Sequence, residues 1–498
     1  MIVSVRSNLT WIIAIIIVII IVGGGLYYIF MGSRPVNTTT SFTPTSASTS
    51  VVTSGVSLSG SITVLLSSGD PTLAPYFQLV ASDFMAKYPN VKVQLQIVPF
   101  AQLVTTAMTS LQSHNPSPDI IIFYPSQAPT LGPYLLDIRK YLDNGVINKT
   151  DIPASSMNAV YLLDKVGQIM KVSGVPFQQV FGYVLVYQKS IFQDQALKDE
   201  FKNKYGFDFD PHVWNTWDKL ITGAQFIQSK GLKKYALLFP DGLTQSILNG
   251  YVGIFYSYAV NDTACTGVPS NAAIGVQGYW TYFKMVNGKV VPTLNCTAGI
   301  KALETHKALI QFQPPITVQA MEYDQLRDLF LTGDYAMVAA WTSFIPIYNN
   351  ANISKVAGNI DIVPLPGGAT GQAPTYAGIN PFSNNPDLAA KFIAFFMSPE
   401  EYKKGIERIG FLPATYSGLE IASSMPQTSW VKPFYESLKK PVNVDLQRLA
   451  IYNSIQNFFT DLRPIFINEV AKYFRGEQSA QDTMNNIVSQ WLKIMKYS

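Results

Sequence analysis

The residue types that usually carry catalysis or metal binding are few and scattered in this sequence. The three histidines, His114, His212 and His306, are far apart, and none belongs to a metal-binding spacing such as HExxH. The two cysteines, Cys265 and Cys296, are too few for a thiolate zinc cage. We therefore expect no metal and no cofactor, and the sequence gives no positive sign of an enzyme.

Other catalytic signatures are missing as well. The run GGATG (Gly367 to Gly371) lacks the GK[ST] ending of a phosphate-binding loop, and no GxSxG nucleophile elbow occurs. Glycoside hydrolysis needs two carboxylates about 5–10 Å apart. A sequence cannot pair its acids in this way, and most of them here belong to helix patterns such as YDQLRDLF, whose charged face is solvated.

Aromatic and uncharged polar residues are the abundant candidates for binding chemistry. The chain has 27 Tyr and 29 Phe, while charged residues make up only 14% of its 498 residues. Mixed pockets of aromatic faces and a few polar groups are typical small-ligand sites and suit uncharged sugars. The balance of 36 basic and 32 acidic residues, 36 − 32 = +4, is too weak for a nucleic-acid partner.

An uncharged segment near the start predicts a single membrane span. No charge occurs from Asn8 to Ser33, which is long enough at about 1.5 Å per residue to cross a bilayer core of about 30 Å. A retained anchor is our main expectation. A signal peptide removed near Gly23 to Gly25 is one alternative. A pilin-like leader cut beside Arg6, as in archaeal leaders, is another.

The next segment favours the outside of the cell. Asn37 to Ser54 is rich in Ser and Thr without charge, which predicts an extended, glycosylated stalk. An extracellular location also fits a Cys265–Cys296 bridge, with two free buried thiols as the alternative. N-x-[ST] sequons begin at Asn8, Asn37, Asn148, Asn261, Asn295 and Asn352.

The body opens as an α/β pattern. Strands are predicted at Ser61–Ser68, Val91–Val98 and Asp119–Phe123, with helices around Phe77–Met85 and Phe100–Leu111 between them. Alternating strands and helices imply a parallel sheet with right-handed crossovers. Ligands bind at the carboxyl ends of such strands, which here are Ser67–Asp70 and Tyr124–Gln127.

Helix starts are well marked further along the chain. Ser398 followed by Pro-Glu-Glu predicts a capping box, and Gly410 predicts the end of that helix. Two more helix starts are predicted. One is at Asn385, which precedes a proline, and the other is at Thr216, the first residue of TWDKLITGAQFI. No repeat of 20–50 residues is present, so we do not expect a solenoid or a propeller.

From about residue 60 to the end, the chain resembles extracellular solute-binding proteins of ABC importers, in the family 1 class that includes maltose-binding protein. The matching blocks occur in family order: the opening strand, KYPNVKV, PDIIIF, SGVPFQQVFGYVLVYQKSIF, NTWDKLITGAQFI, DQLRDLFLTGDYAMVAAWTSF, and PLPGG through YAGIN to GFLPA. The family's Tyr-Asn-Lys strand end is here Tyr187-Gln188-Lys189, so Gln replaces the usual Asn. The "F-x-x-G-x-x-A-M" run leading to Trp341 is the most specific block.

The resemblance implies a two-lobed, periplasmic-binding-protein-like α/β fold with crossover hinge strands, preceded here by the N-terminal transmembrane helix. We place crossovers near Gln178–Gly182 and Tyr376–Pro381. The expected organisation is an anchor or leader (1–36), a stalk (37–59), lobe 1 (60–180 and 378–430) and lobe 2 (181–377 and 431–498).

The same resemblance implies a ligand set taken from both lobes. Trp341 is the leading candidate for stacking on the ligand. Trp214 and Trp217 are expected to pack at a helix start instead. The full ligand set that the resemblance implies is Asp70, Tyr124, Ser126, Gln127, Asp241, Trp341 and Tyr376.

The implied function is capture of a mono- or oligosaccharide by hinge closure and its delivery to a membrane permease driven by a separate ATPase. We expect a monomer on the outer face of the cell membrane. The low charge, the Ser/Thr stalk and a leader without a lipobox cysteine suggest an archaeal host. A membrane-anchored glycoside hydrolase and a surface adhesion glycoprotein remain the alternatives, and a pilin-like subunit is too small to match this body.

Overall fold

Two separate main sheets organise the chain in the computed structural model. The structure describes residues 58–164, 168–182, 184–260, 262, 264–265, 279–315, 323–368, 371–439, 455 and 458–495, all within one compact unit, residues 57–498. The predicted anchor (1–36) lies outside these residues, and so does the predicted stalk (37–59) except for its last two residues. Among the described residues, no helix is both long enough and apolar enough to cross a membrane.

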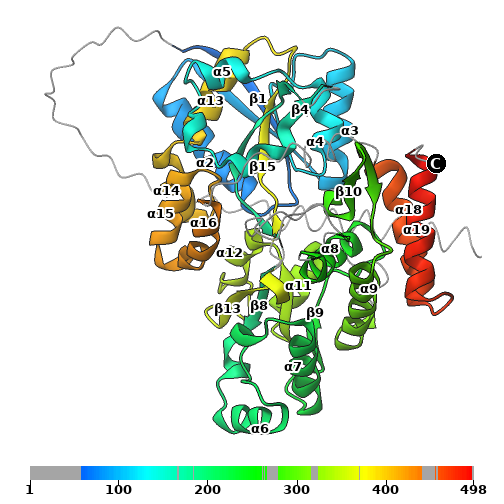
Figure 1. The fold of residues 1–498 in the computed structure, drawn as a ribbon. Coiled ribbons are helices and arrows are strands. Elements are labelled where there is room, and N and C mark those ends of the chain that lie inside the picture. Colours follow the sequence, from blue (N-terminus) through cyan, green and yellow to red (C-terminus); the bar gives the residue numbers. More distant parts are fainter. Residues whose placement is uncertain are drawn as a thin grey trace, which may run out of the picture. The chain divides into compact units, whose positions relative to one another are not determined.

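The first sheet has five strands in the order β2-β1-β3-β15-β6. The strands are β1 (Gly60–Ser67), β2 (Val91–Val98), β3 (Ile120–Phe123), β6 (Val175–Gln178) and β15 (Thr375–Ile379). β1 runs parallel to β2 and β3, which confirms the parallel arrangement predicted from the sequence. β15 is antiparallel to β3 and β6 although it comes late in the chain, and Figure 1 shows it among the first strands.

Helices cover this sheet and form the first core. α2 (Leu73–Lys87) and α3 (Phe100–Gln112) connect the parallel strands, and α13 (Pro386–Phe396) and α14 (Pro399–Ile409) return to the same lobe. The side chains of α2 at Phe77, Val80, Ala81 and Phe84 are all buried, as their three- and four-residue spacing predicts. We call the elements packed around the five-stranded sheet the first lobe.

The second sheet has four strands in the order β13-β8-β12-β9. They are β13 (Ile360–Pro364), β8 (Val184–Gln188), β12 (Tyr335–Ala340) and β9 (Tyr235–Leu238). Every residue of β8 is buried, because alternate side chains enter cores on opposite faces of the sheet. The elements around this sheet are called the second lobe.

One face of the second sheet is covered by a large helical core that includes α18 and α19, and the other by α11 and α12. Helices of the second lobe are α6 (Gln195–Tyr205), α7 (Trp217–Ser229), α8 (Gln245–Ala259), α9 (Thr297–Leu309), α11 (Tyr323–Leu331), α12 (Ile345–Tyr348), α18 (Arg463–Phe474) and α19 (Ala480–Ile494). Shorter elements elsewhere are α4 (Ala128–Leu131), α5 (Arg139–Asp143), β4 (Tyr161–Leu163), β5 (Ile169–Val172), β10 (Phe283–Val286) and β11 (Lys289–Pro292).

The chain passes between the sheets near the predicted crossovers. It leaves the first sheet at β6, forms the short strand β7 (Phe181–Gly182) and enters the second sheet at β8. It returns through β14 (Gly371–Gln372), which pairs with β7, and enters β15. Two antiparallel segments therefore connect the two lobes side by side.

A third connection involves α15 (Tyr416–Ser424) and α16 (Lys432–Leu438). The carboxylate of Asp151, in the first lobe, accepts hydrogen bonds from the backbone N–H and the hydroxyl of Ser417 at the start of α15. Leu419 and Ala422 of the same helix are buried in a core of the second lobe. α15 thus contacts both lobes, and the expected lobe boundary at residue 430 stays a prediction.

The helix-start predictions need one correction. Ser398 caps α14 by accepting a bond from the Glu401 N–H, and Gly410 ends the helix at φ 74°. The reciprocal half of the predicted capping box does not form, because the Glu401 carboxylate binds Lys404 Nζ instead, at 2.7 Å. Asn385 and Thr216 stand at the N-caps of α13 and α7 as predicted.

Cys265 and Cys296 form a disulfide whose Cα atoms are 5.4 Å apart. Cys296 is the N-cap residue of α9, and Cys265 is buried in the large core of the second lobe. Trp214 and Trp217 are also buried in this core, so both pack at the start of α7 as predicted. The disulfide thus connects the segment that follows α8 to the start of α9.

Candidate functional site

The carboxyl ends of three parallel strands meet at one edge of the first sheet. Asp70 follows β1, Phe100 follows β2 and Tyr124 follows β3. The rings of Phe100 and Tyr124 meet edge to face with centroids 5.3 Å apart, and Phe100 remains 37% exposed. This edge therefore presents an aromatic surface beside a carboxylate.

Asp70 is buried and hydrogen bonds hold both of its carboxylate oxygens. Oδ1 accepts bonds from the N–H and the hydroxyl of Thr72, at 2.8 and 2.7 Å, and Oδ2 accepts one from Gln178 Nε2 at 3.1 Å. Burial raises the pKa of Asp70 above its usual value, while hydrogen bonds from Thr72, Gln178 and Ser343 oppose the rise. The carboxylate is thus fixed in position beside the exit of β1.

Tyr124 is half-buried next to Asp70. Burial raises the pKa of its phenol above the usual value, and the negative charges of Asp70 and Asp324 add to this rise. Asp324 belongs to α11 of the second lobe. The Tyr124 hydroxyl therefore stays protonated at neutral pH and can donate a hydrogen bond to a ligand.

The other two predicted residues of this strand exit have different environments. Gln127 is buried, and its Oε1 accepts a bond from the Tyr124 backbone N–H at 3.2 Å. Ser126 lies in the intervening turn and is half-buried. Gln127 therefore closes the turn that carries Tyr124.

Trp341 follows β12 in the second lobe and is half-buried. Its ring meets that of Tyr323 edge to face, with centroids 6.0 Å apart. The backbone of Gly182 in the crossover strand β7 lies directly against the indole, and a Cβ added there would overlap the ring. Trp341 thus lies where the second lobe meets a crossover, next to a small cavity that Arg327 and Phe344 also line.

Two electrostatic influences connect the strand exits of the first lobe with the second lobe. The Ser343 hydroxyl, two residues after Trp341, acts on the Asp70 carboxylate, and the Asp324 carboxylate acts on Tyr124. Asp70, Tyr124 and Trp341 are therefore the predicted residues that lie toward the meeting of the lobes.

Asp241 has a different environment from the one expected. It is fully buried, and its two carboxylate oxygens contact His306 Nε2 and Gln313 Nε2. Gln313 also accepts a bond from the Phe239 N–H through Oε1, at 2.8 Å. These contacts fix the segment after β9 inside the second lobe.

Tyr376 is also directed into protein. Its ring stacks on Phe123 with centroids 5.5 Å apart, and its hydroxyl donates to the Ser156 carbonyl at 2.8 Å. Only 2% of the residue is exposed. In this structure its hydroxyl and ring are therefore used in packing the first lobe.

Three residues at this site were missed in the sequence analysis. Phe100 could have been found, because the strand-exit rule that selected Asp70 and Tyr124 applies equally to β2. Gln178 was expected only as the start of a crossover, and Ser343 carried no sequence signal. Their relevance depends on tertiary contacts with Asp70, a residue 273 and 108 positions away (343 − 70 and 178 − 70).

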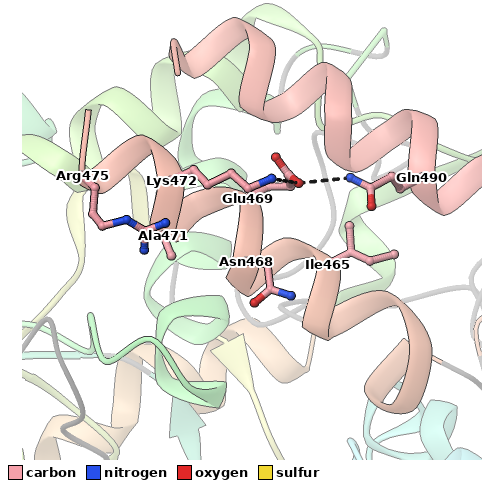
Figure 2. A pocket seen from close by; sticks show the side chains of 7 residues that line it. All are labelled: Ile465, Asn468, Glu469, Ala471, Lys472, Arg475 and Gln490. Atoms are coloured by element: carbon pink, nitrogen blue, oxygen red, sulfur yellow. Dashed lines mark hydrogen bonds and ion pairs between the residues drawn. The ribbon is translucent and has the colours of Figure 1, made fainter. Parts of the chain in front are cut away.

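A hollow of about 440 Å³ lies elsewhere, along α18 and α19 (Figure 2). Three of its polar side chains, Glu469, Lys472 and Gln490, bind one another. The Glu469 carboxylate accepts bonds from Lys472 Nζ at 2.7 Å and from Gln490 Nε2 at 3.2 Å. None of the predicted ligand residues lines this hollow, so we do not place the ligand site there.

The described residues contain no group of three or more His, Cys, Asp or Glu side chains arranged to hold a metal ion. The strand-exit cluster offers aromatic faces, a protonated phenol and a buried carboxylate. This combination can bind a neutral, hydroxyl-rich molecule through its C–H faces and OH groups.

Comparison with known families gives a match over most of the body. The sequence model of the bacterial extracellular solute-binding proteins matches residues 70–403. The matched region begins at Asp70 and includes Tyr124, Trp341 and both crossovers.

The matches to solved structures with the same fold cover almost the whole length of each solved chain. A maltose-bound MalE3 of T. maritima is 17% identical with a TM-score of 0.64, covering 88% of this chain and 99% of its own. A ribitol-bound ABC transporter solute-binding protein of Agrobacterium radiobacter K84 is 16% identical with a TM-score of 0.65, covering 87% and 98%. The GacH receptor of Streptomyces glaucescens, described unliganded and with acarbose, is 18% identical with a TM-score of 0.63, covering 88% and 99%. These likenesses establish the two-lobed fold.

Proposed function

The chain belongs to the bacterial extracellular solute-binding proteins, and from this premise we propose that it captures a neutral mono- or oligosaccharide for an ABC importer. The observation that carries the proposal is the cluster of Phe100, Tyr124 and Asp70 at the strand exits, with Trp341 on the second lobe. Similar proteins described with maltose, acarbose and ribitol support the same ligand class.

In the proposed complex, Trp341 and Phe100 contact the apolar faces of the sugar rings. Tyr124 donates a hydrogen bond to a sugar oxygen, and Ser126 contributes a hydroxyl. Gln127 holds the turn that carries Tyr124, and Asp70, held by Thr72 and Gln178, accepts a hydrogen bond from a sugar hydroxyl through a remaining lone pair. We keep Asp241 and Tyr376 as supports of the site, because their polar atoms already have protein partners.

The proposed mechanism is closure of the two lobes around the ligand. The paired strands β7 and β14 are the natural hinge, since they connect the sheets and span only two residues each. A ligand shifts such an equilibrium only if it binds the closed state more tightly. Contacts from Tyr124 on one lobe and Trp341 on the other would supply that difference.

The cellular setting is part of the proposal. The uncharged Asn8–Ser33 segment supports a membrane anchor, with the binding body outside the cell and a permease with its ATPase as partners. The sequons at Asn148, Asn295 and Asn352 are exposed, which supports a glycoprotein, whereas Asn8, Asn37 and Asn261 lie outside the described residues. The leader and stalk support an archaeal host, and we expect a monomer with the lobe boundaries given above.

Titration of the purified protein with uncharged sugars tests the proposal, with Trp fluorescence and the thermal midpoint as readouts. A ligand at 100 times its Kd adds about 2.7 kcal/mol to the stability of the native state. One sugar should raise the midpoint and change the fluorescence. Binding of a peptide, polyamine or phosphate ester with no response to any neutral sugar would overturn the ligand class.

A turnover assay distinguishes the main alternative. Incubation with chromogenic glycosides is expected to release no chromophore, because a binding protein does not cleave its ligand. Steady release that depends on protein concentration would instead identify a membrane-anchored glycoside hydrolase.

A further inference from the structure

A buried polar chain connects the Asp70 carboxylate to both crossovers. Asp70, Thr72, Gln178 and Thr375 are each no more than 6% exposed. Gln178 Nε2 donates to Asp70 Oδ2 at 3.1 Å and to the Thr72 hydroxyl at 2.9 Å, and its Oε1 accepts from the Thr375 hydroxyl at 2.7 Å. One amide therefore joins three segments of the first sheet.

The position of Gln178 in the chain gives this contact its importance. Gln178 is the last residue of β6, directly before the first crossover, and Thr375 is the first residue of β15, directly after the second. The two residues face each other in the sheet. Gln178 also forms a backbone bridge to Pro413, where the chain passes toward α15.

Each carboxylate oxygen of Asp70 has its own hydrogen-bond donors. Thr72 supplies both bonds to Oδ1, so its hydroxyl hydrogen is committed and its lone pair accepts from Gln178. A buried carboxylate that loses a donor is costly, since water cannot replace it. The orientation of Oδ2 consequently depends on the Gln178 amide, and the Ser343 hydroxyl also acts on this carboxylate.

We propose that Gln178 is a positioning residue. It fixes the Asp70 carboxylate and connects it, by hydrogen bonds, to the residues where both crossovers join the first sheet. The position of the Asp70 carboxylate in the ligand site then depends on the conformation of the hinge. Conversely, a ligand that binds Asp70 changes the hinge conformation through Gln178. The effect of a ligand on the hinge rests on the proposed function. The connection itself does not.

An exchange of charge and amide tests the connection without any ligand. Gln178→Glu places two carboxylates together, and Asp70→Asn turns an amide toward the Gln178 amide, so each single variant should lower the thermal midpoint. Combining Asp70→Asn with Gln178→Glu restores one donor facing one acceptor. The double variant should recover at least about half of the summed loss, because directly coupled residues are not additive.

Gln179 offers a matched control. It is the adjacent residue and is equally buried, but its Nε2 donates only to the Val180 carbonyl among the described contacts, at 3.3 Å. Asp70→Asn combined with Gln179→Glu should show additive losses. Additive losses in the Gln178 pair, or equal recovery in the Gln179 pair, would overturn the proposal.

A milder substitution covers the case in which Gln178→Glu does not fold. Thr375→Val removes the hydroxyl that anchors Oε1 and keeps the side-chain volume. The backbone N–H of Thr72, which donates to Asp70, should then exchange with solvent about fivefold faster, as expected for losing roughly 1 kcal/mol of local protection. Thr483→Val is the control, because Thr483 is a buried threonine of α19 whose hydroxyl donates to the Ser479 carbonyl at 2.8 Å, outside this chain of contacts.

Unchanged exchange at Thr72 in Thr375→Val, or the same acceleration in Thr483→Val, would contradict the proposal. Affinity gives a separate reading. A sugar that binds the wild-type protein should bind Thr375→Val about fivefold more weakly, in line with one lost hydrogen bond. If the wild type binds no sugar, the proposed function fails while the rescue and exchange measurements still decide the role of Gln178.

Discussion

Asp70 and Asp241 show how one sequence rule can select residues with different roles. Both follow a strand of a sheet, and both carry a carboxylate at the position where ligands are usually bound. The Asp70 carboxylate is affected by Ser343 of the second lobe, and its negative charge raises the pKa of Tyr124. Asp241 is instead enclosed by His306 and Gln313, which are distant in sequence. Strand position alone cannot tell the two cases apart.

Trp341 carries the first prediction. Trp341→Ala should weaken sugar binding about 10- to 100-fold, because truncating a central aromatic contact costs roughly 1.4–2.8 kcal/mol. Trp430→Ala is a control, since Trp430 is another half-buried tryptophan and packs on Phe434. Calorimetric titration measures both variants, with circular dichroism to check folding. Equal losses in the two variants would remove Trp341 from the site.

Asp70 carries a prediction about pH. Its folded-state pKa is raised by burial, so the folded protein binds this proton more readily than the unfolded chain does. The charged form therefore costs stability above the raised pKa, and the cost disappears as the pH falls through it. The thermal midpoint of the wild type minus that of Asp70→Asn should increase from pH 7 toward pH 4. A difference independent of pH would contradict the assignment.

The crossover strand β7 carries the prediction at the scale of an element. Gly182→Ala would place a methyl group in the volume of the Trp341 ring, so the indole must move. We expect weaker sugar binding in Gly182→Ala. In a Trp341→Ala background the same change should have almost no further effect on affinity, because the ring is gone. Titration of the four proteins measures this cycle, and additive losses would exclude displacement of the indole as the cause.

Elements with strong periodicity were predictable from the sequence. The pattern of Val91–Val98 predicted β2 at its observed bounds. The apolar run at Asp119–Phe123 predicted β3, which begins one residue later, at Ile120. The Ser398 cap was predictable because its bond is local, whereas the partner of Glu401 was not, since Lys404 competes with the helix start. Phe100 could have been selected, but the contact between Gln178 and Asp70 depends on tertiary structure.

At the scale of the whole molecule, the two lobes differ in the long-range connections that stabilise them. The sheet of the first lobe combines strands that precede the second lobe in sequence with one strand that follows its sheet, because β15 inserts between β3 and β6. The second lobe has a disulfide between residues 31 positions apart in the sequence. The hinge consequently joins two lobes that are stabilised in different ways.

The disulfide gives the corresponding prediction. Replacing both Cys265 and Cys296 by Ala should lower the free energy of unfolding by about 3–4 kcal/mol in the chain-entropy account for a loop of this length. Ligand affinity should change little, since neither cysteine belongs to the proposed ligand set. Denaturant unfolding with and without reductant measures the effect. A variant as stable as the wild type would show that the bridge does not constrain the unfolded chain.

Ligand-driven closure around a neutral sugar is the central step of the proposed function. The direct measurement is small-angle X-ray scattering of the purified protein with and without the sugar selected by titration. We predict a smaller radius of gyration on saturation, absent in Trp341→Ala at the same sugar concentration. Saturating sugar that leaves the radius of gyration unchanged would contradict hinge closure, and a panel of neutral sugars without any ligand would contradict sugar capture itself.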